Sequence, residues 1–265
     1  MTQMTLNDGR SMPQLGMGTY QIPDPQVALV VRKGLDLGFE LVDTAAFYHN
    51  ERGVGEGMQG SDAFLTTKLW NDRHRDADAA LDESLALLGV DAVDLYLIHW
   101  PRPAEGAYVE AWRSLVALRD AGKARSIGVS NFLPEHIDAI VADTGVTPAV
   151  NQIELHPRFQ QRAARDFHEA HGIVTQSWSP LGQGGELLRD PAIAAAAAKH
   201  GRSAAQVVIA WHLAHGLSVI PKAADAEHLS DNFAALDLTL DDEDIAAIDA
   251  LDDPDGRIGP DPALL

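Results

Sequence analysis

The sequence predicts a (β/α)8 TIM barrel of the α/β class, and three observations support this prediction. The chain has 265 residues, near the roughly 250 that such a barrel needs as one domain. Short apolar strand patterns alternate along it with amphipathic helix patterns. Strands separated by helices of this length must pair in parallel, and eight repeats favour closure over an open sheet. We therefore expect residues 1–265 to form a single barrel domain.

The predicted elements begin with a β-hairpin, since Asp8-Gly9 between Thr5 and Met12 is typical of a tight turn. We expect this hairpin to plug the bottom of the barrel. Strand patterns follow at Leu15–Gly18, Leu41–Asp43, Ala63–Lys68, Val93–His99, Ala124–Val129, Ala149–Ile153, Val174–Ser177 and Ser218–Ile220. Helical spacing of apolar residues separates them, at Val27–Leu37, Ala77–Leu88, Tyr108–Arg119, Pro134–Asp143, Gln161–Ala170 and Ser203–Ala214.

Composition limits the partners and the location of the protein. The 20 basic and 39 acidic side chains give a formal net charge of -19, which argues against nucleic acid or an anionic membrane as a partner. No cysteine occurs, so disulfides and thiolate chemistry are excluded. Residues 1–7 carry no secretory apolar segment, and the longest apolar run, Ala192–Ala198, is too short to span a bilayer. We expect a cytoplasmic, soluble monomer that acts on a small molecule.

Four polar residues lie at or just after the carboxyl ends of predicted strands, the rim that carries the chemistry in such barrels. Asp43 ends the second strand pattern, and Tyr48 follows in the next loop. Lys68 ends the third pattern, and His99 ends the fourth. A charged group at the end of a buried strand is costly to desolvate unless it is paired. We therefore expect these four side chains to meet in one active site.

These four residue types suit the reduction of a carbonyl. Tyr48 is the expected acid, but an unperturbed tyrosine has a pKa near about 10, so an ammonium beside it is expected to lower that pKa. Lys68 can supply the charge while Asp43 holds it in place. His99 can donate a hydrogen bond that aligns a carbonyl oxygen with the Tyr48 hydroxyl. Taken singly, a helix cap, a solvated strand end or a core histidine would explain each residue, but not all of them on one rim.

The later strand ends carry amides, hydroxyls and a large aromatic residue. Ser130 and Asn131 follow the fifth strand pattern, Gln152 lies in the sixth, and Trp178 follows the seventh. Such groups can bind a carboxamide and stack on a flat heteroaromatic ring, which is what a nicotinamide presents. Ordinary loop hydrogen bonding stays open as the alternative for Asn131 and Gln152.

Seven segments, in order along most of the chain, resemble the aldo-keto reductases, and in particular short bacterial members such as diketogluconate reductase and methylglyoxal reductase-like proteins. They are GFELVDTAAFYHNE (38–51), LTTKLW (65–70), DLYLIHWP (94–101), IGVSNF (127–132), NQIELHP (151–157), SWSPLG (177–182) and IPK (220–222). The combination is specific, whereas any one segment alone is not.

The resemblance implies a catalytic tetrad of Asp43, Tyr48, Lys68 and His99. Tyr48 would donate a proton while a hydride passes from nicotinamide C4 of NADPH to an aldehyde or ketone, α-dicarbonyls and keto-sugars included. The implied cofactor contacts are Ser130, Asn131 and Gln152 on the carboxamide, Trp178 stacked on the nicotinamide, Ser179, Pro180 and Leu181 along the pyrophosphate, and Gly18, Thr19 and Tyr20 after the first strand.

One departure from the family pattern bears on the choice of cofactor. In the family, a Lys-Ser pair after the last strand and an arginine six residues beyond the lysine usually grip the 2′-phosphate of NADPH. Here Ala223 follows Lys222 and His228 stands in place of the arginine, while Asp231 and Asn232 occupy the expected adenine positions. Because a histidine titrates, we expect NADH to be accepted as well, and the preference for NADPH to rise as pH falls through about 6.5.

Other motifs receive simpler interpretations. Gly55–Gly60 spells GxGxxG but lies in a predicted short helix far from a strand, so it is not a dinucleotide fingerprint. Two histidine pairs, His168 with His171 and His212 with His215, lack metalloprotease spacing and are expected on the surface of outer helices. The rim aromatics are expected to wall the substrate pocket, with loop packing as the alternative; they are Tyr20, Phe47, Trp70 and Trp100.

Two other classes of function stay open at this level. A metal-dependent barrel hydrolase would also use His and Asp at strand ends, but it needs several converging ligands and only His99 is clearly placed. A non-catalytic subunit that senses nicotinamide nucleotides could keep the same site on the same fold. Turnover of carbonyl compounds would separate the reductase from both.

Overall fold

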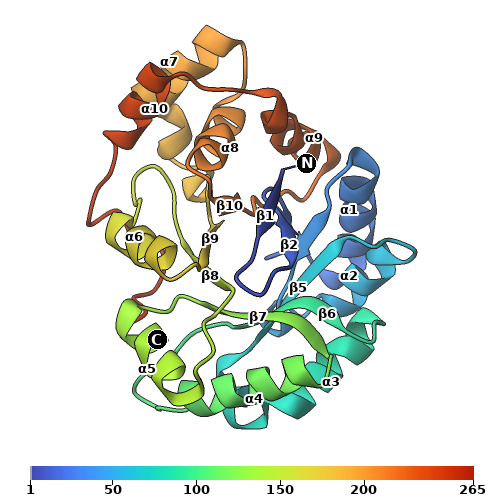
Figure 1. Ribbon diagram of the computed structural model, residues 1–265. Coiled ribbons are helices and arrows are strands. Elements are labelled where there is room, and N and C mark those ends of the chain that lie inside the picture. Colours follow the sequence, from blue (N-terminus) through green and yellow to red (C-terminus); the bar gives the residue numbers. More distant parts are fainter. Residues whose placement is uncertain (1) are drawn as a thin grey trace.

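The computed structural model describes residues 2–265 and shows an eight-stranded parallel sheet that curls into a barrel with helices around it (Figure 1). Neighbours in the sheet are consecutive in the chain, from β3 to β10. The barrel closes because the amide of Gly16 donates to the carbonyl oxygen of Val219 over 2.9 Å, and the amide of Gly18 donates to Pro221 over 3.2 Å. The predicted (β/α)8 barrel is confirmed.

The bounds of the eight barrel strands and of six of the helices agree closely with the predicted patterns. The barrel strands are β3 (Met17–Gly18), β4 (Leu41–Asp43), β5 (Phe64–Leu69), β6 (Val93–Ile98), β7 (Ala124–Ser130), β8 (Val150–Glu154), β9 (Val174–Trp178) and β10 (Ser218–Val219). The helices are α1 (Asp24–Leu37), α2 (Glu51–Met58), α3 (Ala77–Leu88), α4 (Tyr108–Asp120), α5 (Pro134–Thr144), α6 (Arg162–Ala170), α7 (Pro191–His200), α8 (Ala204–Ala214), α9 (Ala226–Phe233) and α10 (Asp242–Asp249).

Helices α7, α9 and α10 were not predicted. In the alanine-rich sequence of α7 almost every residue is apolar, so the helical period cannot be seen. Its start is nevertheless well specified, since the Asp190 carboxylate accepts from the amide of Ala192 and Pro191 occupies the first turn. Within residues 2–265, no helix combines the length and the apolar character that crossing a membrane requires.

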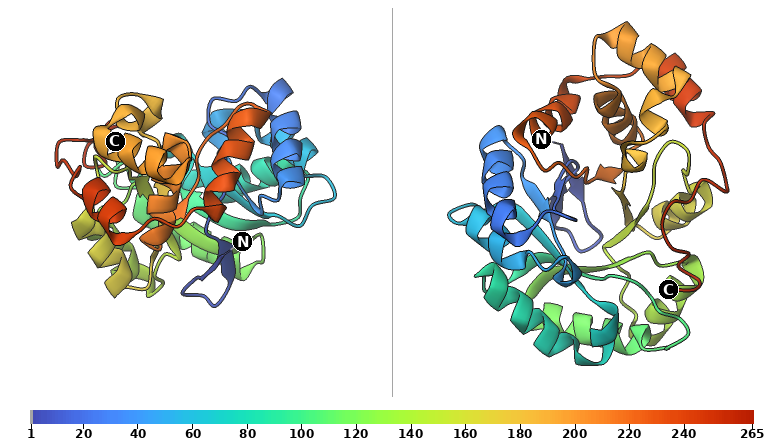
Figure 2. Two further views of the ribbon diagram at one scale, coloured as in Figure 1. Left: turned by 90° about the horizontal axis from the view of Figure 1, so that it is seen from above. Right: turned by 180° about the vertical axis from the view of Figure 1, so that it is seen from behind.

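The predicted hairpin is present and closes one end of the barrel. Strands β1 (Gln3–Thr5) and β2 (Ser11–Pro13) pair antiparallel, with Met4 opposite Met12. The side view shows the hairpin projecting from one end of the barrel (Figure 2, left). Leu6 and Met12 are buried and pack against Leu41, Leu95 and other side chains inside the barrel. The amino end of the barrel is therefore sealed by apolar contacts.

Strand alternation carries polar groups to the opposite, carboxyl end. Residues two apart on a strand face the same side, and in β6 the side chains of Leu95 and Leu97 pack inside the barrel while Tyr96 packs outward among the helices. The next inward position is His99. In β4, Leu41 belongs to the inner apolar cluster and Asp43 is the next inward residue. The apolar interior thus ends in a polar layer.

Candidate active site at the carboxyl end of the barrel

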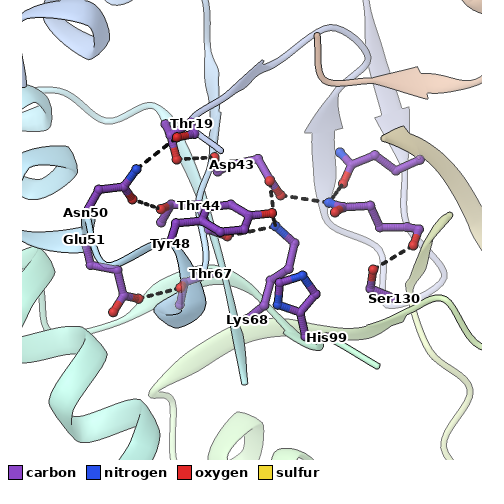
Figure 3. A network of polar contacts seen from close by, with 12 residues as sticks. Thr19, Asp43, Thr44, Tyr48, Asn50, Glu51, Thr67, Lys68, His99 and Ser130 are labelled. Atoms are coloured by element: carbon purple, nitrogen blue, oxygen red, sulfur yellow. Dashed lines mark hydrogen bonds and ion pairs between the residues drawn. The ribbon is translucent and has the colours of Figure 1, made fainter. Parts of the chain in front are cut away.

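The four residues predicted as a catalytic set converge in this polar layer (Figure 3). The Lys68 ammonium donates to Asp43 Oδ1 over 2.6 Å and to the carbonyl oxygen of Thr44 over 2.8 Å. The Tyr48 hydroxyl lies 3.4 Å from Lys68 Nζ. The rings of Tyr48 and His99 meet edge to face, with centroids 5.8 Å apart. One cation therefore joins the carboxylate to the phenol.

Burial sets the protonation behaviour of this cluster. The side chains of Lys68 and Asp43 are 0% and 2% exposed. Burial raises the pKa of Asp43 and lowers that of Lys68, and the contact between them opposes both shifts. Burial also holds the pKa of His99 well below its usual value, and the nearby Lys68 charge lowers it further. The imidazole is therefore neutral near pH 7.

The expected lowering of the Tyr48 pKa is wrong. Burial raises the pKa of Tyr48 well above its ordinary value, and the charges of Asp43 and Tyr20 add to the rise. The sequence-based expectation considered Lys68 alone, but its ammonium is already paired with Asp43, so the pair presents little net charge to the phenol. Tyr48 thus keeps its proton until a strongly basic oxygen forms beside it.

Asn50 holds the loop that carries Tyr48, a role that sequence reasoning missed. Its amide nitrogen donates to the carbonyl oxygens of Thr19 and Ile22, each over 2.9 Å. Its side-chain oxygen accepts from the Thr44 hydroxyl over 2.8 Å. A fully buried asparagine that makes three hydrogen bonds ties the end of β3 to the loop after β4. In the sequence, this role could have been suggested by the position of Asn50, an amide residue two positions after Tyr48, the predicted acid.

A second polar cluster lies beside the first, built from the ends of β7, β8 and β9. Asn131 donates to the carbonyl oxygen of His99 over 3.1 Å and to the Ser130 hydroxyl over 3.0 Å, and its side-chain oxygen accepts from the Trp178 indole over 2.8 Å. The Ser130 hydroxyl donates to the carbonyl oxygen of Gln152 over 2.8 Å. Four residues that sequence analysis grouped together are therefore in mutual contact.

The Gln152 side chain donates its amide hydrogens to other side chains of the protein. Its nitrogen donates to Asp43 Oδ2 over 2.8 Å and to Gln176 Oε1 over 2.7 Å. Asn131 uses its amide hydrogens in the same way. Each of these side chains therefore offers a ligand an acceptor oxygen and no donor.

The backbone is strained immediately after two of these strands. Asn131 and Ser179 have φ values of +62° and +47°, in the left-handed region that residues other than glycine seldom occupy. They follow β7 and β9 directly. Strained backbone of this kind clusters at functional sites, where the surrounding contacts hold it. The Asn131 side chain, with its three hydrogen bonds, provides such contacts here.

Glu154, which sequence analysis did not single out, fastens the C-terminal segment to this rim. Its carboxylate accepts from the amides of Ile258 and Gly259 over 2.6 and 2.8 Å. A Cβ atom at Gly259 would lie 2.5 Å from the Trp178 ring, so only glycine permits this approach. The indole of Trp178 is therefore confined at one edge by Asn131 and at another by the segment around Gly259. A carboxylate two residues beyond Gln152, on the same face, was the available signal.

The predicted rim aromatics surround Tyr48 and His99. Tyr20 packs on Tyr48 with ring centroids 5.0 Å apart, and Trp70 lies edge to face on His99 at 5.0 Å. Phe47 stacks on Trp70 at 3.8 Å, and Trp100 meets Trp178 at 6.4 Å. Tyr20 and Phe47 remain 47% and 39% exposed. These rings border the polar layer and leave apolar surface open to a ligand.

The residues expected at the adenine end lie farther along the chain, around α8 and α9. A surface cavity of about 570 Å³ is lined by Ser203, Gln206, Glu227, His228, Ser230, Asp231 and Ala234. The His228 ring lies 2.6 Å from the Asp225 carboxylate, which raises the pKa of the histidine. Lys222 is exposed and has no ion-pair partner within residues 2–265. Ala223 and Asn232, by contrast, are buried and do not line the cavity.

The surface prediction for the paired histidines is wrong for one member of each pair. His168 and His212 are both 0% exposed, since these helices turn one histidine toward the barrel. His168 contacts the Asn151 amide and the Thr175 hydroxyl, each over 2.9 Å. Burial lowers the pKa of His168 to about 4 and that of His212 to about 3. Gly55–Met58 of the GxGxxG segment lie on α2, and Gln59 and Gly60 follow the end of the helix.

Comparisons with known proteins agree with this geometry. Residues 12–253 match the Aldo/keto reductase family. The chain is 48% identical to an aldo-keto reductase of Mycolicibacterium smegmatis, over 98% of this chain and 96% of that protein. It is 45% identical to methylglyoxal reductase DkgA of Escherichia coli, over 98% of this chain and 97% of the relative.

Solved structures give the same result. The apo form of Gox0644 superposes with a TM-score of 0.96 at 50% identity, covering 98% of this chain and 97% of the other. A mutant of Gox0644 in complex with NADPH gives a TM-score of 0.97 at 50% identity, over 99% and 97% of the two chains. The chain therefore belongs to the aldo/keto reductase family.

Proposed function

We propose that this protein is an NADPH-dependent reductase that converts an aldehyde or ketone to the alcohol, with Tyr48 as the proton donor. The observation that carries the proposal is the buried Lys68 ammonium, which contacts Asp43 at 2.6 Å and the Tyr48 hydroxyl at 3.4 Å. Membership of the family supports the reaction class. The methylglyoxal reductases among its relatives favour α-dicarbonyls, with keto-sugars as further candidates.

The residues present fit NADPH. The side-chain oxygen of Gln152 and the remaining lone pair of the Asn131 oxygen, which also accepts from the Trp178 indole, suit the NH2 group of a nicotinamide carboxamide, and the half-buried Trp178 offers an aromatic face. The unpaired Lys222 ammonium suits a phosphate, and the cavity beside His228 suits an adenosine. Further residues that would hold the cofactor are Gly18, Thr19, Tyr20, Ser130, Ser179, Pro180, Leu181, Ala223, Asp231 and Asn232. When bound, NADPH supplies a hydride from nicotinamide C4.

Each side chain of the tetrad has a separate role in protonating the substrate oxygen. Neutral His99 donates a hydrogen bond that orients the carbonyl oxygen of the substrate toward Tyr48. Tyr48 retains its proton because its pKa is raised, and it yields the proton only as negative charge develops on the substrate oxygen. The Lys68 ammonium then stabilises the phenolate that remains, and Asp43 keeps the ammonium in place.

Replacing Tyr48 by Phe tests the proposal. NADPH oxidation would be followed for wild type and variant over a panel of aldehydes, α-dicarbonyls and keto-sugars. General acid catalysis contributes about 100- to 10,000-fold, so we expect kcat to fall by roughly that factor while NADPH binding, measured by quenching of protein fluorescence, is retained. Unchanged turnover in the variant would refute the assigned acid. Tight NADPH binding by the wild type without turnover of any carbonyl would favour a nucleotide-sensing subunit.

We also propose that the chain acts as a cytoplasmic monomer built as a single barrel domain. The closed barrel and the net charge of -19, which disfavours association with anionic surfaces, support this proposal. Light scattering on the purified protein tests the monomer, and a mass of twice 28.5 kDa would contradict it.

A further inference from the structure

We propose that Gln176 is a positioning residue for the reaction. It fixes the side chain of Gln152, and it thereby orients both the Asp43 carboxylate and the oxygen of Gln152 that faces the cofactor. This inference rests on the roles proposed above for Asp43 and Gln152. Gln176 lies in the middle of β9 and touches none of Tyr48, Lys68 and His99 by a hydrogen bond.

The geometry is a chain of hydrogen bonds across the inside of the barrel. Gln152 Nε2 donates to Asp43 Oδ2 over 2.8 Å and to Gln176 Oε1 over 2.7 Å. Gln176 Nε2 donates in turn to the Ser218 hydroxyl over 3.0 Å. The chain joins β4, β8, β9 and β10, and none of its four side chains is more than 2% exposed. The branch that leaves Asp43 on the side away from Lys68 is visible in Figure 3.

The chemistry of the groups fixes the direction of every bond in this chain. Asp43 Oδ2 accepts, so the Gln152 side chain must turn its NH2 group toward it. The second hydrogen of that NH2 group then needs an acceptor, and the oxygen of the Gln176 amide accepts it over 2.7 Å. Gln176 consequently presents its own NH2 group to Ser218. Neither amide in the chain can flip by itself without setting two donors or two acceptors against each other.

The fixed direction of these hydrogen bonds affects both Asp43 and the side-chain oxygen of Gln152. Asp43 holds Lys68 with Oδ1 and is held by Gln152 at Oδ2, so its carboxylate is fixed from both sides. With its NH2 group committed, Gln152 keeps its oxygen turned toward the expected carboxamide. Without Gln176, one buried N–H of Gln152 has no acceptor. The cost of this unsatisfied donor favours rotation of the Gln152 amide away from Asp43.

A purely space-filling role does not account for Gln176. Other positions inside the barrel are filled by apolar side chains such as Leu95 and Leu97. An apolar residue would fill the same volume without the cost of burying an amide. The hydrogen bonds of the Gln176 amide therefore explain its presence, and Gln152, which donates to it, also donates to Asp43.

The test compares Gln176→Met, which keeps the volume and removes the hydrogen bonds, with Gln176→Glu. A neutral glutamic acid reproduces the pattern, since its carbonyl oxygen accepts from Gln152 and its hydroxyl donates to Ser218. Loss of one buried bond of this kind predicts a fall in kcat/KM of about 10-fold for Gln176→Met. We expect Gln176→Glu to remain within about 3-fold of wild type.

The decisive measurement is a double-mutant cycle with Gln152→Leu, read as kcat/KM and as the dissociation constant of NADPH. If Gln176 acts only through Gln152, the double variant Gln152→Leu/Gln176→Met matches Gln152→Leu alone. A general structural defect would instead add its cost to that of Gln152→Leu. Additive effects of the two substitutions would therefore overturn the proposal.

Two milder variants decide the matter if Gln176→Met does not fold. Ser218→Ala removes the far anchor of the chain and is expected to lower kcat/KM about 3-fold. Ser126→Ala is the matched control, because it removes a buried serine hydrogen bond to Asp8 at the hairpin end and should leave kcat/KM unchanged. Equal activity of the two serine variants would contradict the proposal.

Failure of this inference is distinguishable from failure of the proposed function. A Gln152→Leu variant with wild-type kinetics, or a wild type that turns over no carbonyl, would count against the proposed function. A strongly impaired Gln152→Leu beside a fully active Gln176→Met would leave that function intact and remove only the role of Gln176.

Discussion

Two acid–base pairs at this end of the molecule have the same contact distance and opposite electrostatic behaviour. Lys68 lies 2.6 Å from Asp43, and His228 lies 2.6 Å from Asp225. The first pair is 0% and 2% exposed, whereas the second is 73% and 54% exposed. In the buried pair the pKa of the acid is raised and that of the base is lowered, but in the exposed pair both shifts are reversed.

The comparison shows that desolvation, and not contact distance, decides the direction of these shifts. Burial penalises each charge in the Asp43–Lys68 pair by more than the partner returns. At the surface the penalty is small, so the hydrogen bond between Asp225 and His228 dominates, although solvent screens it. An acidic and a basic group in contact therefore form a buried pair in one place and a titratable surface pair in the other.

The largest expected effect comes from breaking the buried pair with Lys68→Met. It leaves Asp43 buried without its cation, which costs about 3 to 5 kcal/mol of unfolding free energy. It also removes the charge that stabilises the Tyr48 phenolate, so kcat should fall by about 1000-fold. Urea denaturation and NADPH oxidation measure the two effects.

The matched control is Lys123→Met, which removes a partly exposed lysine paired with Asp82 on the outside of the barrel. We expect kcat to stay within about 2-fold of wild type, and the free energy of unfolding to change by less than about 1 kcal/mol. Equal losses of stability in the two variants would contradict the distinction between buried and exposed pairs.

A second prediction concerns buried histidines that form no ion pair within residues 2–265. His74, His168 and His212 have pKa values lowered by burial to about 4, 4 and 3. Below about pH 6.5 the unfolded chain binds protons that the folded chain excludes, so stability falls with acidification by about 1.4 kcal/mol per pH unit for each histidine. Three of them predict acid unfolding before pH 4.

Urea denaturation at pH 7, 6 and 5 measures this slope. His212→Gln should flatten the slope, whereas substitution of the exposed His171 by Gln should leave it as in wild type. If the free energy of unfolding stays constant between pH 7 and 5, the prediction that buried, neutral histidines make stability depend on pH is wrong.

The smallest expected effect concerns the exposed pair and the choice between NADPH and NADH. We expect protonated His228 to favour the 2′-phosphate, so the NADPH/NADH ratio of kcat/KM should fall as pH rises through the pKa of His228, which Asp225 raises above the ordinary histidine value. Asp225→Asn removes the cause of that rise and should move the midpoint of the transition to lower pH. Stability should not change measurably, because the pair is screened by solvent.

Steady-state kinetics with both cofactors from pH 5.5 to 8.5 provide the measurement, with Lys222→Met as the companion variant. We expect Lys222→Met to weaken NADPH binding at every pH without moving the midpoint. A ratio that does not depend on pH in the wild type would remove His228 from cofactor selection.

Most of the fold, and the convergence of Asp43, Tyr48, Lys68 and His99, could be predicted from the sequence. The alternation of strand and helix patterns located all eight barrel strands, and the position of a residue at a strand end located the rim. Asp43, Lys68 and His99 were predictable because each continues the inward-facing set of its own strand, a property of local sequence alone. Helix α7 was not predicted because its alanine-rich sequence hides the helical period, and α9 and α10, of 8 residues each, were not predicted either.

Only the tertiary structure decided the direction of the Tyr48 pKa, the burial of His168 and His212, and the chain from Gln176 to Asp43. Each depends on groups that are distant in sequence, and on how much water their packing removes. A strand pattern shows which way a side chain points, but it does not show what lies opposite. Desolvation and hydrogen-bond direction arise only when the strands close into a barrel, so the sequence alone determines the site and the packed fold determines its electrostatics.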